Sequence, residues 1–102
     1  MPYFAVHAID RPGLGALRSE LRPPHRERLR LHDHPVTVRI GGPLLDEAGA
    51  MAGSLLVIEA DSRAAVDAYL AGDPYVRGGL FERIEVREFL WGLDQRREAP
   101  GG

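Results

Sequence analysis

The chain has 102 residues, of which 44% are hydrophobic and 27% charged, and this composition indicates a single soluble domain with its own core. A formal net charge of −2 argues against nucleic acid as a partner, because phosphate-binding domains carry a basic face. No apolar run approaches the roughly 20 residues that cross a bilayer, so no membrane partner is expected. The absence of cysteine excludes disulfides, thiol nucleophiles and cysteine-bound metals.

The first predicted element is a strand over residues 2–9, in which Phe4, Val6 and Ala8 alternate with a second set of mostly apolar residues. Residues 10–13 end this strand. The segment lacks the basic n-region of a signal peptide, so export is not expected and a cytoplasmic location is predicted.

A first helix is expected around the double proline Pro23-Pro24. A proline inside a helix costs about 3 kcal/mol, whereas one in the first turn costs almost nothing. We therefore expect a helical turn or two over residues 14–21, and a main helix that starts near Pro23 and runs to about Arg30. His25 then lies in the first turn of the main helix.

The rest of the chain predicts two strands, a second helix and a closing strand. Residues 36–40 alternate and predict a strand that ends there. Residues 54–60 predict the next strand, and its residues Leu55 to Ile58 are apolar at odd and even positions alike, which is typical of a strand covered on both faces. Asp61 or Ser62 then caps a helix, and residues 84–86 mark the last strand.

The resulting order is βαββαβ, the split βαβ pattern of a ferredoxin-like α+β domain. It predicts an antiparallel four-stranded sheet with two helices on one face over residues 1–91, followed by a polar C-terminal tail at 92–102. Two helices leave one face of the strand at 54–60 uncovered, and an apolar patch of this kind points to a partner. Packing the open sheet faces of two copies together, in a homodimer, is the simplest cover.

Several residues with reactive or charged side chains fall at one edge of the predicted sheet. The end of the first strand, the start of the first helix and the end of the second helix meet there, which brings together Asp10, Arg18, Arg22, His25 and Asp73. A carboxylate beside a histidine fixes the imidazole tautomer and raises its basicity, as a general base requires.

Each of these residues also has an interpretation without a function. His25 in a first helical turn is commonly a solvated surface residue, and Asp73 before a proline commonly forms a turn. Arg18 and Arg22 are four residues apart and share a helix face that is normally solvated, although the neighbouring helix N-terminus favours an anion.

His32 and His34 flank Asp33 at the predicted end of the first helix, where histidine commonly complements the helix dipole. We therefore expect no metal at this position, and the sequence indicates no cofactor elsewhere.

The loop after the second helix contains the turn Asp73-Pro74-Tyr75. Pro74 is expected to hold Asp73 in an extended conformation outside the helix, and the glycines at 78–79 let the chain turn into the last strand. This placement predicts that Asp73 lies within hydrogen-bond reach of His25, with Asp10 as the rival carboxylate.

Over nearly all of residues 1–91 the chain resembles the YciI-like (YCII-related) domain family. The segment RSELRPPH carries the family's spaced arginines and histidine, GGPLLDEAGAMAGSLLVIEA its central hairpin, and DPYVRGGLFERIEVREF its closing segment. Pro24 is a departure from the family's usual pattern. The resemblance implies a ferredoxin-like fold assembled as a dimeric α/β barrel, with a site centred on His25 and Asp73.

The resemblance also implies lyase, isomerase or dehalogenase chemistry on small aromatic or lactone compounds. Our first hypothesis is a small cytoplasmic enzyme in which His25, held by Asp73, moves a proton on a small organic acid or cyclic compound. An anionic ligand is expected because arginines surround this pair. The predicted substrate-binding residues are Arg18, Arg22, Ser54, Tyr75 and Asp10. The second hypothesis is a non-catalytic dimeric module that binds a metabolite in the same pocket.

Overall fold

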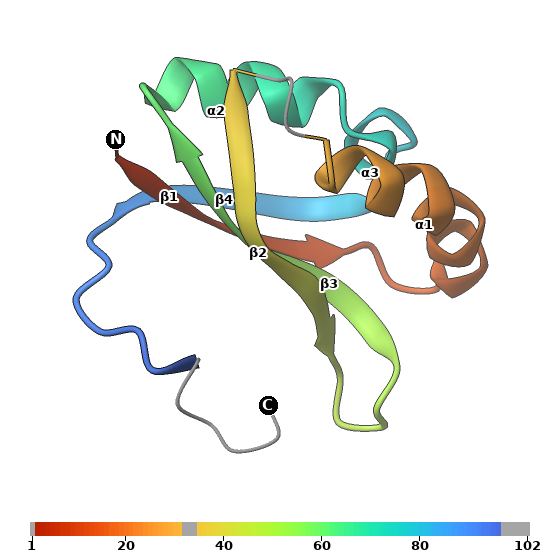
Figure 1. Cartoon of the computed structure of the whole chain (residues 1–102). Coiled ribbons are helices and arrows are strands. Elements are labelled where there is room, and N and C mark those ends of the chain that lie inside the picture. Colours follow the sequence, from red (N-terminus) through yellow and green to blue (C-terminus); the bar gives the residue numbers. More distant parts are fainter. Residues whose placement is uncertain (1, 32–34, 97–102) are drawn as a thin grey trace.

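The structure is a computed structural model of the whole chain, and it describes residues 2–31 and 35–96. Its elements in chain order are β1 (Tyr3–Asp10), α1 (Gly15–Leu29), β2 (Val36–Leu45), β3 (Met51–Ala60), α2 (Arg63–Ala71), α3 (Pro74–Arg77) and β4 (Phe81–Phe89). The four strands form one antiparallel sheet in the order β2-β3-β1-β4. The helices lie on one side of this sheet (Figure 1). The predicted ferredoxin-like βαββαβ topology is confirmed.

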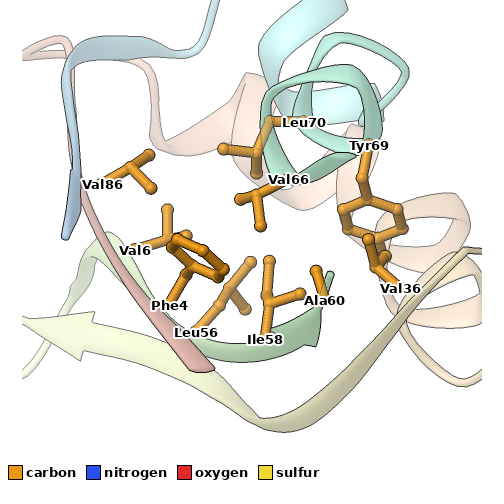
Figure 2. Packing of buried hydrophobic residues seen from close by; sticks show 10 residues of the cluster. All are labelled: Phe4, Val6, Val36, Leu56, Ile58, Ala60, Val66, Tyr69, Leu70 and Val86. Carbon is orange, nitrogen blue, oxygen red and sulfur yellow. The ribbon is translucent and has the colours of Figure 1, made fainter. Parts of the chain in front are cut away.

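The core lies between the sheet and α2. Because successive side chains of a strand point to opposite faces, every second residue of β1 and β3 faces the helices. Figure 2 shows these side chains converging on Val66 and Leu70 of α2, with the ring of Tyr69 at one end. The strand residues of this cluster are Phe4, Val6, Val36, Leu56, Ile58, Ala60 and Val86.

Helix α1 runs without a break through Pro23 and Pro24. The prediction that the main helix starts near Pro23 is wrong, and so is the first-turn position of His25, which lies in the last third of α1. Each proline removes one backbone hydrogen bond from the helix. The helix nevertheless continues because buried side chains anchor both of its halves, Arg18 before the prolines and His25 after them. Tertiary contacts of this kind outweigh local propensity.

Strand β2 also continues beyond its predicted end at residue 40, through Gly41-Gly42-Pro43 to Leu45. An edge strand tolerates proline because one of its sides needs no ladder hydrogen bond, and β2 is at the edge of the sheet. Gly41 packs closely on β3, since a Cβ there would lie 2.9 Å from Cδ2 of Leu56 and that side chain would have to shift. The long β2–β3 hairpin therefore passes beside α1, where it forms one wall of the site described below.

The predicted loop between α2 and β4 contains a short helix, α3. Ser62 caps α2, because its Oγ accepts a hydrogen bond of 3.1 Å from the backbone N–H of Ala65. Asp73 then caps α3 with an extended backbone, at φ −70° and ψ 134°, and Pro74 occupies the first helical position. The predicted extended conformation of Asp73 is confirmed, and a proline costs little at this position of a helix.

The sheet face opposite the helices, here called the open face, is partly covered by the chain's own C-terminal segment. Leu55 is 39% exposed on this face, whereas Val57 is only 8% exposed. After β4 the chain turns back beneath the sheet (Figure 1), and Trp91 packs edge-on against Tyr3 and Phe89, at ring-centroid distances of 5.3 and 5.7 Å. Among the described residues, no helix is long and apolar enough to span a membrane.

Candidate functional site

Two buried side chains of α1 define the site. Arg18 and His25 are 3% and 6% exposed. They are seven residues apart, close to two helical turns, so they lie on the same face of α1. The continuous helix therefore sets the spacing between a buried cation and a buried imidazole.

Arg18 joins α1 to the ends of β1 and β3. Its Nε and Nη2 donate to the two carboxylate oxygens of Asp10 at 2.7 and 3.0 Å. Nη2 also donates to the backbone oxygen of Gly53 at 2.8 Å and to Oγ of Ser54 at 2.9 Å. Burial alone lowers the pKa of Arg18, but the hydrogen bond and the charge of Asp10 outweigh burial and raise it. Arg18 is thus a permanent cation at this site.

One terminal nitrogen of Arg18 keeps donor capacity. Nη1 makes a single long contact of 3.4 Å, to the hydroxyl of Tyr75. A guanidinium has five N–H donors, two of them on Nη1. The predicted role of Arg18 in binding a substrate stays a prediction, and Nη1 is the atom that remains for it.

His25 and Asp73 are in direct contact, with 2.7 Å between Nδ1 and Oδ1. The second oxygen of Asp73 accepts a hydrogen bond of 2.9 Å from the backbone N–H of Tyr75. Asp73 therefore has two roles: one carboxylate oxygen contacts His25, and the other holds the turn at residues 73–75. The predicted proximity is confirmed for Asp73, whereas the rival carboxylate, Asp10, binds Arg18. Among the described residues, nothing is hydrogen-bonded to Nε2 of His25.

The ring of Tyr75 contacts both buried side chains of α1, Arg18 and His25. Its ring stacks on the imidazole of His25, with 3.9 Å between centroids and 20° between planes. The guanidinium carbon of Arg18 lies 4.6 Å from the same ring centroid. Burial raises the pKa of Tyr75, and the opposing effect of Arg18 and Arg22 is smaller. The phenol is therefore neutral at physiological pH and keeps a proton to donate.

These residues surround a cavity of about 150 Å³. Its walls come from α1, from residues 41–43 of β2, and from Ser54 and Tyr75. His25 and Arg22 line it from the helix side. A cavity of this size, with two hydroxyl groups, an imidazole and guanidinium groups in its walls, suits a small polar ligand.

Comparison with known proteins places this arrangement in a family. Residues 2–90 match the model of the YCII-related domain. The chain belongs to the YciI-like (YCII-related) family. Protein YciI of Escherichia coli O6:H1 is 32% identical over 92 residues, which cover 84% of this chain and 94% of that protein. The YciI protein of Shigella flexneri matches equally well.

A solved structure with a TM-score of 0.75 and 29% identity is the 5-chloro-2-hydroxyhydroquinone dehydrochlorinase (TftG) from Burkholderia phenoliruptrix AC1100, in complex with 2,5-dihydroxybenzoquinone. The match covers 86% of this chain and 93% of that one. An antibiotic biosynthesis monooxygenase is similar at a TM-score of 0.56 over 88% of this chain and 97% of its own. Its identity of 14% shows a shared fold and no more.

Two parts of the cavity at His25 were not predicted from the sequence. The first is Arg26, which lines the cavity beside Arg22. The second is the backbone of β2 from Gly41 to Pro43. The spacing of four between the arginines was visible, but the assumed helix start at Pro23 separated them. The glycines gave no signal, because a wall made of backbone has no side-chain pattern.

No group of three or more His, Cys, Asp or Glu side chains suited to a metal occurs in the described part of the chain. The two histidines weighed as a metal pair, His32 and His34, lie outside the described residues. The expectations of no metal and no cofactor therefore remain expectations.

Proposed function

We propose that this chain is a small enzyme that uses His25 and Asp73 for acid–base chemistry on a small cyclic compound or organic acid. The observation that carries the proposal is the buried 2.7 Å contact between Nδ1 of His25 and Oδ1 of Asp73, in the wall of a polar cavity. A histidine held in this way can take up and release a proton near neutral pH.

In the proposed reaction Asp73 accepts the hydrogen bond from Nδ1–H of His25. This fixes the tautomer with a lone pair on Nε2, which is the nitrogen that takes a proton from an acidic O–H or C–H group of the substrate. In an elimination, the electron pair left behind forms the new double bond and the leaving group departs with its own pair. In an isomerisation, the imidazolium returns the proton to a different atom of the ring.

Negative charge develops on the substrate in either reaction, and groups in the cavity walls can stabilise it. Oγ of Ser54 accepts from Arg18 and still has its own O–H to donate. The neutral phenol of Tyr75 has the same capacity, and Nη1 of Arg18 adds a fixed positive charge. Preorganised donors of this kind act where charge develops in the transition state.

One similar solved structure supports a dehalogenase or lyase reaction as the first class to test. The dehydrochlorinase from Burkholderia phenoliruptrix AC1100 is 29% identical, and its structure contains 2,5-dihydroxybenzoquinone. A hydroxylated six-membered ring carrying chlorine is therefore the first substrate class that we propose for this chain. An anionic ligand, a homodimer and a cytoplasmic location belong to the same proposal.

The test is turnover by the wild type and by His25→Gln on chlorinated hydroxyhydroquinones, measured as chloride release. We expect His25→Gln to lower kcat by about 10²- to 10⁴-fold, the usual contribution of a general base. Arg63→Gln is the control, because Arg63 lies on α2 with a side chain 57% exposed. Unchanged turnover in His25→Gln would refute the proposed role of His25. Binding of these compounds without turnover would instead favour the non-catalytic module.

A further inference from the structure

A second hollow adjoins the cavity at His25. Its volume is about 220 Å³, and it lies between α1 and β2. Arg26, Leu29 and Gly41 line both spaces, so the two are neighbours. Arg30 and Val38 complete the outer one. A ligand at His25 can therefore extend along α1.

Three arginines lie along these two spaces: Arg22, Arg26 and Arg30. We call the surface that they border the arginine groove. They are spaced by four residues, which places them in a row on one side of α1. Arg22 is the innermost, because it is half-buried where the other two are exposed, and its charge acts on Tyr75. All three also border a wide surface hollow of about 680 Å³ on the outer side of α1.

No described carboxylate pairs with these arginines. The arginines that form ion pairs with described residues are Arg18, Arg39, Arg63, Arg83 and Arg96. Glu27 is the acidic residue among those that line the wide hollow, and it forms no ion pair with a described residue. The groove therefore carries an excess of positive charge, and its planar guanidinium groups suit a carboxylate.

The volumes explain why a ligand would use both spaces. Ligand pockets commonly measure about 300–1,000 Å³, and the cavity at His25 has only about 150 Å³. It can hold one small ring, and a substituent on that ring can extend into the neighbouring space beside Arg26.

We infer that the arginine groove binds the carboxylate of a side chain attached to the reacting ring, with Arg26 and Arg30 as the residues that select for it. The substrate class is then a cyclic compound with a short carboxylate-bearing side chain. This inference rests on the proposed function only for the position of the ring at His25. It assigns a ligand-binding role to two residues that the sequence did not indicate.

The experiment compares 3-phenylpropionate with its neutral amide, 3-phenylpropanamide, on the ¹⁵N-labelled full chain, with dissociation constants from NMR titration. The wild type should bind the acid about tenfold more tightly than the amide, since a charge-assisted hydrogen bond is stronger than a neutral one. Arg26→Gln and Arg30→Gln should each raise the dissociation constant of the acid by about three- to tenfold. The dissociation constant of the amide should change by less than about twofold. Both side chains are exposed, so the substitutions leave the core intact.

A control variant and the choice of readout separate the groove from other effects. Arg63→Gln changes the net charge by the same amount, and it should leave the affinity for the acid unchanged. The readout is binding of the acid and of the amide, and it involves no turnover, so a failure of the proposed reaction leaves it untouched. The inference is overturned if acid and amide bind equally or if the acid does not bind. It is also overturned if Arg63→Gln weakens binding of the acid as much as Arg26→Gln does.

Discussion

Two buried carboxylates support the site in different ways. Asp10 balances the charge of Arg18, at a contact of 2.7 Å between side chains that are 3% and 8% exposed. Asp73 instead contacts His25 through one oxygen and a backbone N–H through the other. The first carboxylate compensates a buried cation, and the second orients the imidazole of His25.

Replacement of Asp10 tests the first of these roles. Asp10→Ala leaves Arg18 as a buried charge without its partner, so we expect the free energy of unfolding to fall by about 3–5 kcal/mol. Asp67→Ala is the matched control, because Asp67 pairs with Arg63 through side chains that are 55% and 57% exposed. That change should cost less than about 1 kcal/mol. Urea unfolding measures both values, and similar small losses would show that Asp10 does not compensate Arg18.

The buried phenol of Tyr75 predicts a loss of stability in alkali. Burial raises the pKa of Tyr75, so the folded chain keeps a proton that the unfolded chain releases near pH 10. The stabilisation is complete below about pH 10 and is lost as the pH rises toward the pKa of the folded state. Tyr75→Phe should therefore lose less stability than the wild type between pH 8 and pH 11.

Urea unfolding at these two pH values measures that difference. Tyr69 contributes a similar fall in both proteins, because burial also raises its pKa. The free energy of unfolding of Tyr75→Phe should therefore still fall with pH, through Tyr69. An identical loss of stability in the wild type and in the variant would contradict the prediction.

Among the elements, α1 shows where sequence reasoning succeeded and where it failed. The proximity of His25 and Asp73 was predicted correctly, but the topological reason for it was wrong, because His25 lies in the last third of α1 and not at its start. The family resemblance pointed to the same pair independently of the helix start. The helix start was predicted wrongly, because the rule that proline ends a helix is local. Here the contacts of Arg18 and His25 with the rest of the chain decide the outcome.

Other features of the site left no mark in the sequence. A four-residue helix such as α3 is too short to show a period. The volume of the cavity depends on how closely β2 approaches α1, which the order of elements does not specify. The ring stacking between Tyr75 and His25 depends on side-chain directions that only the packed structure defines.

The interior prolines of α1 give a prediction about stability. Pro24→Ala restores a backbone hydrogen-bond donor inside the helix, so we expect the free energy of unfolding to rise by about 1–2 kcal/mol after the gain in unfolded-chain entropy is subtracted. Pro74→Ala is the matched control, since Pro74 occupies the first position of α3. It should instead lower stability by about 0.4–1 kcal/mol. Thermal unfolding shows whether each variant is more or less stable than the wild type. A destabilised Pro24→Ala would contradict the continuous helix.

For the whole molecule, we expect the open face to determine how the protein assembles. Its centre is apolar, and residues after β4 cover only part of it. The homodimer expected from the sequence, with sheet packed on sheet, would cover the remainder. Such an interface stays a prediction, and two side chains with equal exposure on opposite faces of the sheet provide its test.

Leu55 and Ile84 are both 39% exposed. Leu55 pairs with His7 on the open face, whereas Ile84 pairs with Ala8 on the helix face. Leu55→Asp should convert a dimer into a folded monomer, because a charge buried in an apolar interface without a partner is costly. Ile84→Asp should leave the dimer intact. Sedimentation at micromolar concentration gives the masses, and a monomeric wild type would refute the expected assembly.

The packing of Trp91 gives the open face an optical signal of its own. Trp91 is the single tryptophan of the chain, and it is partly buried against Tyr3 and Phe89. The guanidinium carbon of Arg96 lies 4.7 Å from its ring centroid. Indole fluorescence responds to water and to nearby charge, so its emission wavelength reports on whatever covers this face. Dilution, a second copy of the chain or displacement of the C-terminal segment can each be followed in the native protein without an attached dye.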